Sequence, residues 1–94
     1  MYAIKTLPEF DTWLNGLKDR NTRLRLGRSL RGNLDDVESV GGGVFEMREY
    51  FGTGWRMYYA KCRNTLILML GGGTKRSQKY DINKAKQREN TLED

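Results

Sequence analysis

Histidine is missing from this chain of 94 residues, and cysteine and proline each occur once. The side chain that most often serves as general acid or base is therefore absent. With Cys62 alone, neither an intrachain disulfide nor a Cys/His zinc site can form. Because no histidine can activate its thiol, Cys62 is expected to be a small apolar residue in or near a strand. We expect neither a metal nor a cofactor.

Long apolar runs are also missing. The longest purely apolar stretch covers residues 66–70, far short of the ~20 residues that a membrane helix needs. The N-terminus begins an alternating pattern and lacks the apolar segment of a signal peptide. We therefore expect a cytoplasmic protein with no membrane partner. A chain of this length holds a single domain, residues 1–94, with a frayed end over about 89–94.

Basic residues outnumber acidic ones, 17 to 12, which gives a net charge of +5. Such a balance favours a polyanionic partner: nucleic acid, a membrane surface or an acidic protein. No acidic residue interrupts the arginine-rich stretch 20–31, which is either a solvated helix face or a surface that contacts RNA phosphates. The candidate RNA contacts are Arg20, Arg23, Arg28, Arg31 and Lys79.

Hydrophobic spacing predicts the element order β-α-α-β-β-β-α, an α+β fold with a four-stranded, antiparallel-rich sheet. The two early helices would pack on the sheet face that carries residues 45, 47, 55, 57 and 59, and the last helix follows the sheet. The first strand would join at the edge of the meander or beside its central strand. Asp19 and Ser77 are expected to cap the second and last helices. The predicted strands are 2–6, 44–50, 55–59 and 65–70, the helices begin near Pro8, Asp19 and Ser77, and the predicted turns are 34–38, 41–43, 51–54, 61–64 and 71–73.

Four sequence pieces occur in an informative order. They are Pro8-Glu9-Phe10-Asp11-x-Trp13-Leu14, Gly42-Gly43-Val44-Phe45-Glu46-Met47-Arg48, Gly52-Thr53-Gly54-Trp55-Arg56-Met57-Tyr58-Tyr59, and the run from Leu70 to Ile82 that reads LGGGTKRSQKYDI. Together they resemble the RelE/ParE toxin superfamily, in particular its phage-type, HigB-like branch of addiction module killer proteins. Three positions depart from that branch: Trp55 stands where Tyr is usual, Thr74 replaces Asp, and Tyr80 replaces a charged residue. The piece Arg76-Ser77-x-x-Tyr80 is closer to the RelE ending, where a Tyr takes part in cleavage.

The resemblance implies a RelE-like fold and a specific activity. It implies the toxin component of a bacterial or prophage type II toxin–antitoxin system that cleaves mRNA on the ribosome without a metal and so blocks translation. The implied partners are the ribosome, mRNA and a DNA-binding antitoxin, commonly of the helix-turn-helix type. Two alternatives stay open: a non-enzymatic, ParE-like inhibitor of DNA gyrase, and a catalytically decayed RNA-binding relative.

RNA cleavage without a metal needs a base for the ribose 2′-hydroxyl, an acid for the leaving oxygen and cations for the phosphate. Guanidinium groups match phosphate oxygens well. Arg48 and Arg56 are predicted on neighbouring strands, pointing away from the apolar face. The glycine runs lack P-loop spacing, so a nucleotide cofactor is not expected. The candidate catalytic residues are Arg48, Arg56, Lys75, Arg76 and Tyr80, with Glu46 in a supporting role.

Each candidate also has a purely structural interpretation. Arg48 is equally suited to pair with Glu46 or Glu49 on a solvated strand, and Lys75 and Arg76 to be ordinary loop charges. Tyr80 is either a core residue of the last helix, a stacking surface for a base, or a general base whose pKa is lowered by the surrounding cations.

Overall fold

The computed structural model describes residues 3–32, 37–63 and 65–92 of the chain. Predicted features at Tyr2, at 33–36, at Asn64 and at 93–94 lie outside these residues. In the described part no helix is long and apolar enough to cross a membrane. The elements are β1 (Ala3–Thr6), α1 (Pro8–Asn15), α2 (Arg20–Gly32), β2 (Val37–Gly41), β3 (Val44–Glu49), β4 (Trp55–Cys62), β5 (Leu66–Thr74), the short 3₁₀ helix η1 (Lys75–Ser77) and α3 (Gln78–Asn90).

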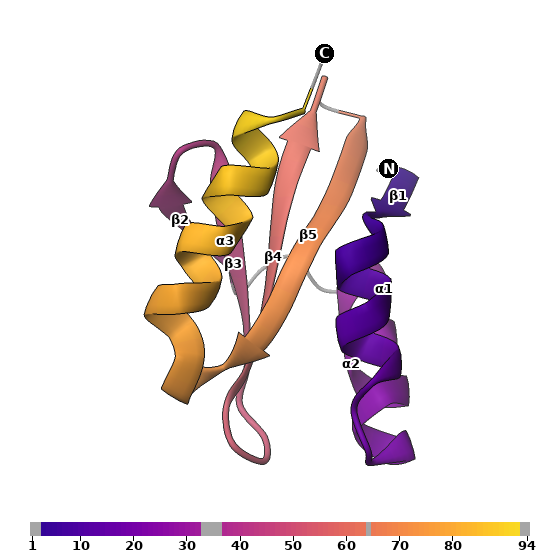
Figure 1. Ribbon diagram of the computed structural model, residues 1–94. Coiled ribbons are helices and arrows are strands. Elements are labelled where there is room, and N and C mark those ends of the chain that lie inside the picture. The colour runs from indigo at the N-terminus through magenta and orange to yellow at the C-terminus, as the bar shows by residue number, and fades with distance from the viewer. Residues whose placement is uncertain (1–2, 33–36, 64, 93–94) are drawn as a thin grey trace.

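The strands form one five-stranded sheet in the order β1-β5-β4-β3-β2. β1 runs parallel to β5, and the other neighbours are antiparallel. Helices α1 and α2 lie on one face of the sheet and α3 on the other (Figure 1). The predicted α+β class and the β3–β4–β5 meander are confirmed, and the first strand joins at the edge of the meander.

The predicted number of strands was wrong, because β2 adds a fifth. β2 pairs with β3, and Val37 lies opposite Met47 while Glu38 lies opposite Glu46. The sequence pattern predicted an acidic turn over 34–38, of which 34–36 lies outside the described residues. The turn that follows β2 does use glycine, and Gly41, Gly42 and Gly43 all have positive φ, which costs glycine little.

Two apolar clusters hold the layers together, one on each side of the sheet. Strand alternation sends successive side chains to opposite faces, so neighbouring residues of β4 enter different clusters. This confirms the predicted packing of α1 and α2 on the face of residues 45, 47, 55, 57 and 59. The buried members of the first cluster are Phe10, Leu26, Leu30, Met47, Met57, Tyr59, Ile67 and Met69, and those of the second are Val44, Tyr58, Ala60, Leu70 and Ala85.

The glycine run 71–73 lies inside β5 and does not end that strand as predicted. Its glycines make room for the helices on both faces. A Cβ on Gly72 would lie 2.4 Å from the ring of Trp13 in α1, and one on Gly71 would lie 2.6 Å from the Arg88 guanidinium in α3. A Cβ at position 72 would overlap the ring and force a shift, whereas the guanidinium near position 71 is the end of a flexible side chain that can move aside.

Several element boundaries also differ from prediction. β4 continues to Cys62, where a turn over 61–64 was expected, and α3 continues to Asn90, where fraying from residue 89 was expected. The Asp19 cap is confirmed, since its carboxylate accepts hydrogen bonds from the Thr22 amide at 3.2 Å and hydroxyl at 2.7 Å. Ser77 does not cap α3 through its side chain; its hydroxyl donates to Asp81 instead.

Candidate functional site

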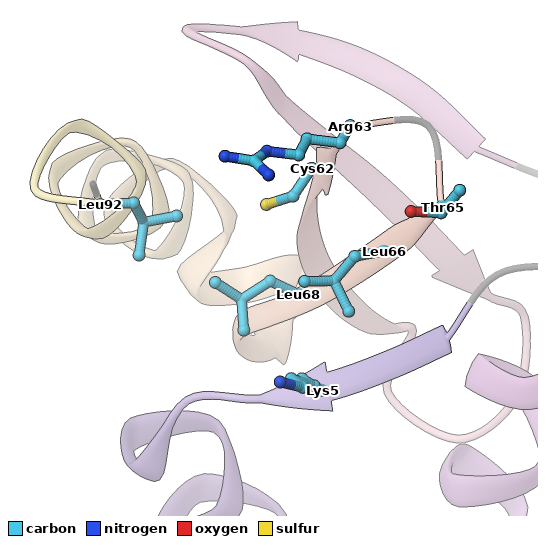
Figure 2. Close-up of a pocket in the computed structure, with 7 residues that line it drawn as sticks. All are labelled: Lys5, Cys62, Arg63, Thr65, Leu66, Leu68 and Leu92. Carbon is cyan, nitrogen blue, oxygen red and sulfur yellow. The ribbon is translucent and has the colours of Figure 1, made fainter. Parts of the chain in front are cut away.

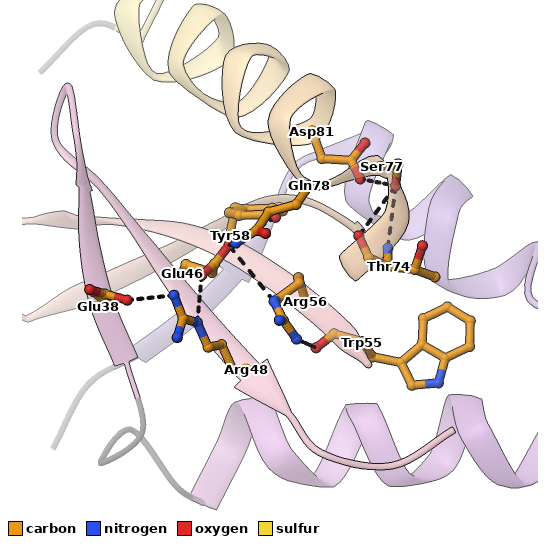
Figure 3. A network of polar contacts seen from close by, with 10 residues as sticks. All are labelled: Glu38, Glu46, Arg48, Trp55, Arg56, Tyr58, Thr74, Ser77, Gln78 and Asp81. Carbon is orange, nitrogen blue, oxygen red and sulfur yellow. Dashed lines mark hydrogen bonds and ion pairs between the residues drawn. The ribbon is translucent and has the colours of Figure 1, made fainter. Parts of the chain in front are cut away.

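A buried carboxylate organises a polar network between the sheet and the start of α3 (Figure 3). Glu46 of β3 is fully buried. One of its oxygens accepts a hydrogen bond from Arg48 Nε at 2.8 Å. The other accepts one from Gln78 Nε2 at 2.8 Å and one from the Tyr58 hydroxyl at 3.1 Å. The network therefore joins two strands and the first turn of α3 through a single side chain.

Strand alternation and register explain how these side chains meet. Glu46 and Arg48 are two residues apart on β3, and Arg56 and Tyr58 are two apart on β4, so each pair shares a face. In the β3–β4 register Glu46 lies opposite Tyr58, and Arg48 lies opposite Arg56. The prediction that Arg48 and Arg56 point away from the α1/α2 face is confirmed.

Arg56 is more enclosed than a surface residue, since only 7% of it is exposed. Its Nε lies 4.0 Å from a Glu46 oxygen and has no hydrogen-bond partner among the described residues. Nη1 donates to the Trp55 carbonyl oxygen at 3.4 Å. Arg56 is thus a buried positive charge with unused hydrogen-bonding capacity.

The charges of the network follow from these contacts. Burial disfavours the charged form of Glu46, but hydrogen bonds from Arg48, Gln78 and Tyr58 outweigh burial and hold the pKa of Glu46 below its usual value. The Glu46 hydrogen bond also raises the pKa of Arg48. Burial, followed by the nearby Glu46 charge, raises the pKa of Tyr58. Tyr58 therefore stays a neutral donor and is not a general base.

Arg48 is the part of the network that opens to solvent. About a third of its side chain is exposed, and its outer nitrogen Nη2 pairs with Glu38 at 2.5 Å. The Glu38 side chain is itself 60% exposed, and exposed ion pairs contribute little. A phosphate can therefore replace Glu38 on Arg48 while Glu46 keeps the guanidinium in place.

Lys75 and Arg76 lie at the same end of the sheet. Both are exposed residues of η1, and the Lys75 amide donates to the Gly54 carbonyl oxygen at 2.8 Å. A Cβ on Gly54 would lie 3.5 Å from Lys75 Cβ and 3.6 Å from Arg56 Nη1, which places Lys75 beside Arg56. The structure thus brings Arg48, Arg56 and Lys75 together and places Arg76 next to them in the chain.

Tyr80 is not part of this group. It lies two residues after Gln78, which is about 200° around an α-helix, and it lines a pocket with Glu9 and Trp13 of α1. Its ring is 63% exposed, so it is not a core residue, and Lys84 Nζ lies 5.6 Å from the ring centroid. Tyr80, a candidate catalytic residue, therefore does not adjoin Arg48 and Arg56, because α3 turns the ring toward α1. Lys79 is exposed in the same turn.

The arginines of α2 form a separate group on the other face of the sheet. Arg20, Arg28 and Arg31 are exposed, whereas Arg23 is half-buried and donates to the Leu17 carbonyl oxygen. Because α2 and α3 cover opposite faces (Figure 1), these side chains do not adjoin the Glu46 network.

A second hollow lies at the opposite end of β5 (Figure 2). It has a volume of about 420 Å³ and a mostly apolar lining. Cys62 borders it as the half-buried last residue of β4, and the predicted place of Cys62 in a strand is confirmed. The lining residues are Lys5, Cys62, Arg63, Thr65, Leu66, Leu68 and Leu92.

Sequence reasoning missed three partners in the network. Tyr58 could have been found from its alternation with Arg56. Glu38 could not, because β2 was not predicted, and Gln78 could not, because its contact with Glu46 spans 32 residues of chain.

The lowered pKa of Glu46 predicts an acid-dependent loss of stability. A carboxyl whose pKa is lower in the folded than in the unfolded chain stabilises the fold fully above its unfolded pKa. This contribution disappears as the pH falls through the lower, folded pKa. We expect an NMR pH titration of the folded protein to place the Glu46 midpoint below 4.5, the usual value. A midpoint at or above 4.5 would show that burial outweighs the three hydrogen bonds.

Comparison with known proteins gives one informative relative. No family model matches the chain. A Haemophilus influenzae protein, described as an uncharacterized protein, is 37% identical over 87 residues, which cover 88% of each chain.

Proposed function

This chain belongs to the same family as that Haemophilus influenzae protein, and from its own residues we propose that it is the toxin of a type II toxin–antitoxin pair. In this proposal it is a cytoplasmic, RelE-like protein of the HigB-like branch. It cleaves mRNA on the ribosome without a metal, and an antitoxin of the helix-turn-helix type neutralises it.

One observation supports the proposal above the others. Glu46 is fully buried and holds Arg48 at 2.8 Å, beside the buried Arg56. Burying two charged groups is costly, and a fold stabilised only by apolar packing has no need of them. A preorganised pair of guanidinium groups is, however, well suited to the charge that develops on a phosphate during its cleavage.

The reaction can be written for these residues. The ribose 2′-oxygen forms a bond to phosphorus and the bond from phosphorus to the 5′-oxygen breaks, which leaves a 2′,3′-cyclic phosphate and a 5′-hydroxyl. The proton lost from the 2′-hydroxyl is balanced by one delivered to the 5′-oxygen. Arg48, Lys75 and Arg76 contact the phosphate. Arg56 adds positive charge from its buried position opposite Arg48 on β4. Glu46 and Tyr58 are buried and position the arginines, and Tyr80 faces α1, so the group that accepts the 2′-hydroxyl proton and the group that protonates the 5′-oxygen come from the ribosome or the RNA.

Induction in growing bacteria tests the proposal. We expect translation-dependent cleavage of mRNA, mapped by primer extension, and cleavage at least about tenfold slower for Lys75→Ala/Arg76→Ala. A matched control is Lys5→Ala/Arg63→Asn, which removes the same charge at the other end of the sheet. Asn suits position 63 because Arg63 has a φ of 56° and Asn tolerates that conformation.

Two other outcomes would reject the nuclease. Growth arrest with intact mRNA and gyrase-dependent DNA breaks would establish the ParE-like inhibitor. Normal growth with an intact, folded protein would favour the alternative that the chain is a catalytically decayed RNA-binding relative.

A further inference from the structure

An exposed aromatic ring stands at the end of β3, next to the candidate site. Tyr50 is 74% exposed, more than the exposed Leu24 or Tyr80. It directly follows Glu49, the last residue of β3. A ring with this exposure has a free face on which another aromatic group can stack.

Tyr50 lies close to Arg48 in the chain. Alternation along β3 directs Glu46 and Arg48 to the α3 face, and Tyr50 follows two residues after Arg48, just beyond the end of the strand. The Tyr50 side chain is near enough to the Arg48 guanidinium to contribute, after Glu46, to its raised pKa. The ring therefore lies near the residue that would hold a phosphate, and it stays in solvent.

The next aromatic residue serves a different purpose. Phe51 is half-buried on the α2 side, where the Arg25 guanidinium lies 4.0 Å from the centroid of its ring. Phe51 thus anchors the β3–β4 hairpin to α2. This anchoring fixes the chain directly after Tyr50, so the exposed ring is presented from a fixed point of the hairpin.

We propose that Tyr50 is a stacking platform for a nucleobase of single-stranded RNA whose neighbouring phosphate is bound by Arg48. This inference rests on the proposed function and names the form of the substrate at that site. A base in a duplex is stacked between its neighbours and cannot cover an outside ring, whereas an unpaired base can. A stacked base and a bound phosphate belong to the same nucleotide, which matches the adjacency of ring and guanidinium. An acidic peptide would form ion pairs with Arg48, but the Tyr50 ring would add little to its affinity.

A binding experiment separates stacking from cleavage. The probe is a short, fluorescein-labelled single-stranded RNA with 2′-O-methyl groups, which removes the nucleophile and leaves the bases and phosphates. We expect Tyr50→Ala to weaken binding about tenfold, which is typical of the loss of one stacked base. Tyr50→Phe should bind within about twofold of the native chain, because the ring remains. Leu24→Ala, an exposed apolar residue on the opposite face, is the matched control and should bind as the native chain does.

The dependence of binding on salt gives a second readout. Loss of a phosphate contact lowers this dependence, whereas loss of stacking leaves it unchanged. Arg48→Gln should therefore reduce it and Tyr50→Ala should not.

Three results would overturn the stacking role. The first is unchanged binding by Tyr50→Ala. The second is a loss for Tyr50→Phe equal to that for Tyr50→Ala, which would make Tyr50 a positioning residue for Arg48. The third is Tyr50-dependent binding of an oligoglutamate peptide as tight as that of RNA, which would assign the ring to a protein partner.

The two proposals can fail separately. Tyr50-dependent RNA binding with intact cellular mRNA would keep the stacking role and reject the nuclease. Cleavage of cellular mRNA by the native chain, together with RNA binding that does not depend on Tyr50, would support the nuclease and reject the stacking role.

Discussion

Replacing Glu46 by Gln is expected to lower the free energy of unfolding by about 3 kcal/mol, because it removes the only acidic charge buried beside Arg56 in the described part of the chain. The shape of the side chain is kept, but Arg48 and Arg56 lie opposite each other, and among the described residues only the exposed Glu38 would then offset their charge. The Gln amide would also present a donor to Arg48, Gln78 or Tyr58, each of which now donates to Glu46. Urea unfolding at neutral pH measures the loss.

Glu38→Gln provides the matched control. Glu38 pairs with the same arginine, but its side chain is 60% exposed, so the expected cost is at most about 1 kcal/mol. Equal effects of the two substitutions would mean that Arg48 and Arg56 do not depend on the buried carboxylate. The proposed site would then lose its organising residue.

Gly72→Ala is expected to destabilise the fold by about 2 kcal/mol, within the range found for overpacked cores. The added Cβ would meet the Trp13 ring at 2.4 Å. That ring is fixed by its neighbours, since its centroid lies 5.7 Å from that of Phe10 and 6.3 Å from that of Trp55. Relief therefore requires a shift of α1 relative to β5, which thermal unfolding would register as a lower midpoint.

Gly27→Ala is the control for the glycine effect itself. A Cβ on Gly27 meets nothing within 4 Å, and the residue lies in the middle of α2. Alanine should stabilise this helix by about 0.5–1 kcal/mol. A gain at position 27 and a loss at position 72 would show that the β5 glycines are kept for close approach. A neutral Gly72→Ala would show that α1 adapts freely.

The sheet core could be predicted from the sequence because its pattern is local. Phe45 and Met47, then Met57 and Tyr59, alternate cleanly, and each pair was assigned to the correct face. Asp19 is followed three residues later by Thr22, a local relation that fixes the start of α2.

Features that depend on contacts between distant segments could not be predicted. The strand 37–41 is short and glycine-ended, and only its pairing with β3 makes it a strand. Gly71–Gly73 has the composition of a turn, yet these residues are extended because they pair with β4. Trp13, Arg88 and Asp81 occupy the space that side chains at these positions would need. Trp13 and Arg88 lie far from these glycines in the sequence, so a short sequence window around the glycines does not include them.

The candidate site shows the same division. Alternation correctly placed Arg48 and Arg56 on one face, but it gave no indication that Arg56 would be buried. The position of Tyr80 depends on the phase of α3, which begins after the 3₁₀ turn of η1. An error of two residues in that phase moves a side chain to the other side of a helix.

The parallel pairing of β1 with β5 affects when the chain can fold during its synthesis. Ala3 pairs with Leu66 and Thr6 with Met69, so the edge of the sheet closes a loop that contains most of the protein. Closing such a loop is entropically costly, and topologies rich in distant contacts fold slowly. Because translation delivers the N-terminus first, β1 must wait for its partner until the last third of the chain has been made. The growing chain therefore completes its tertiary structure only near the end of its own translation.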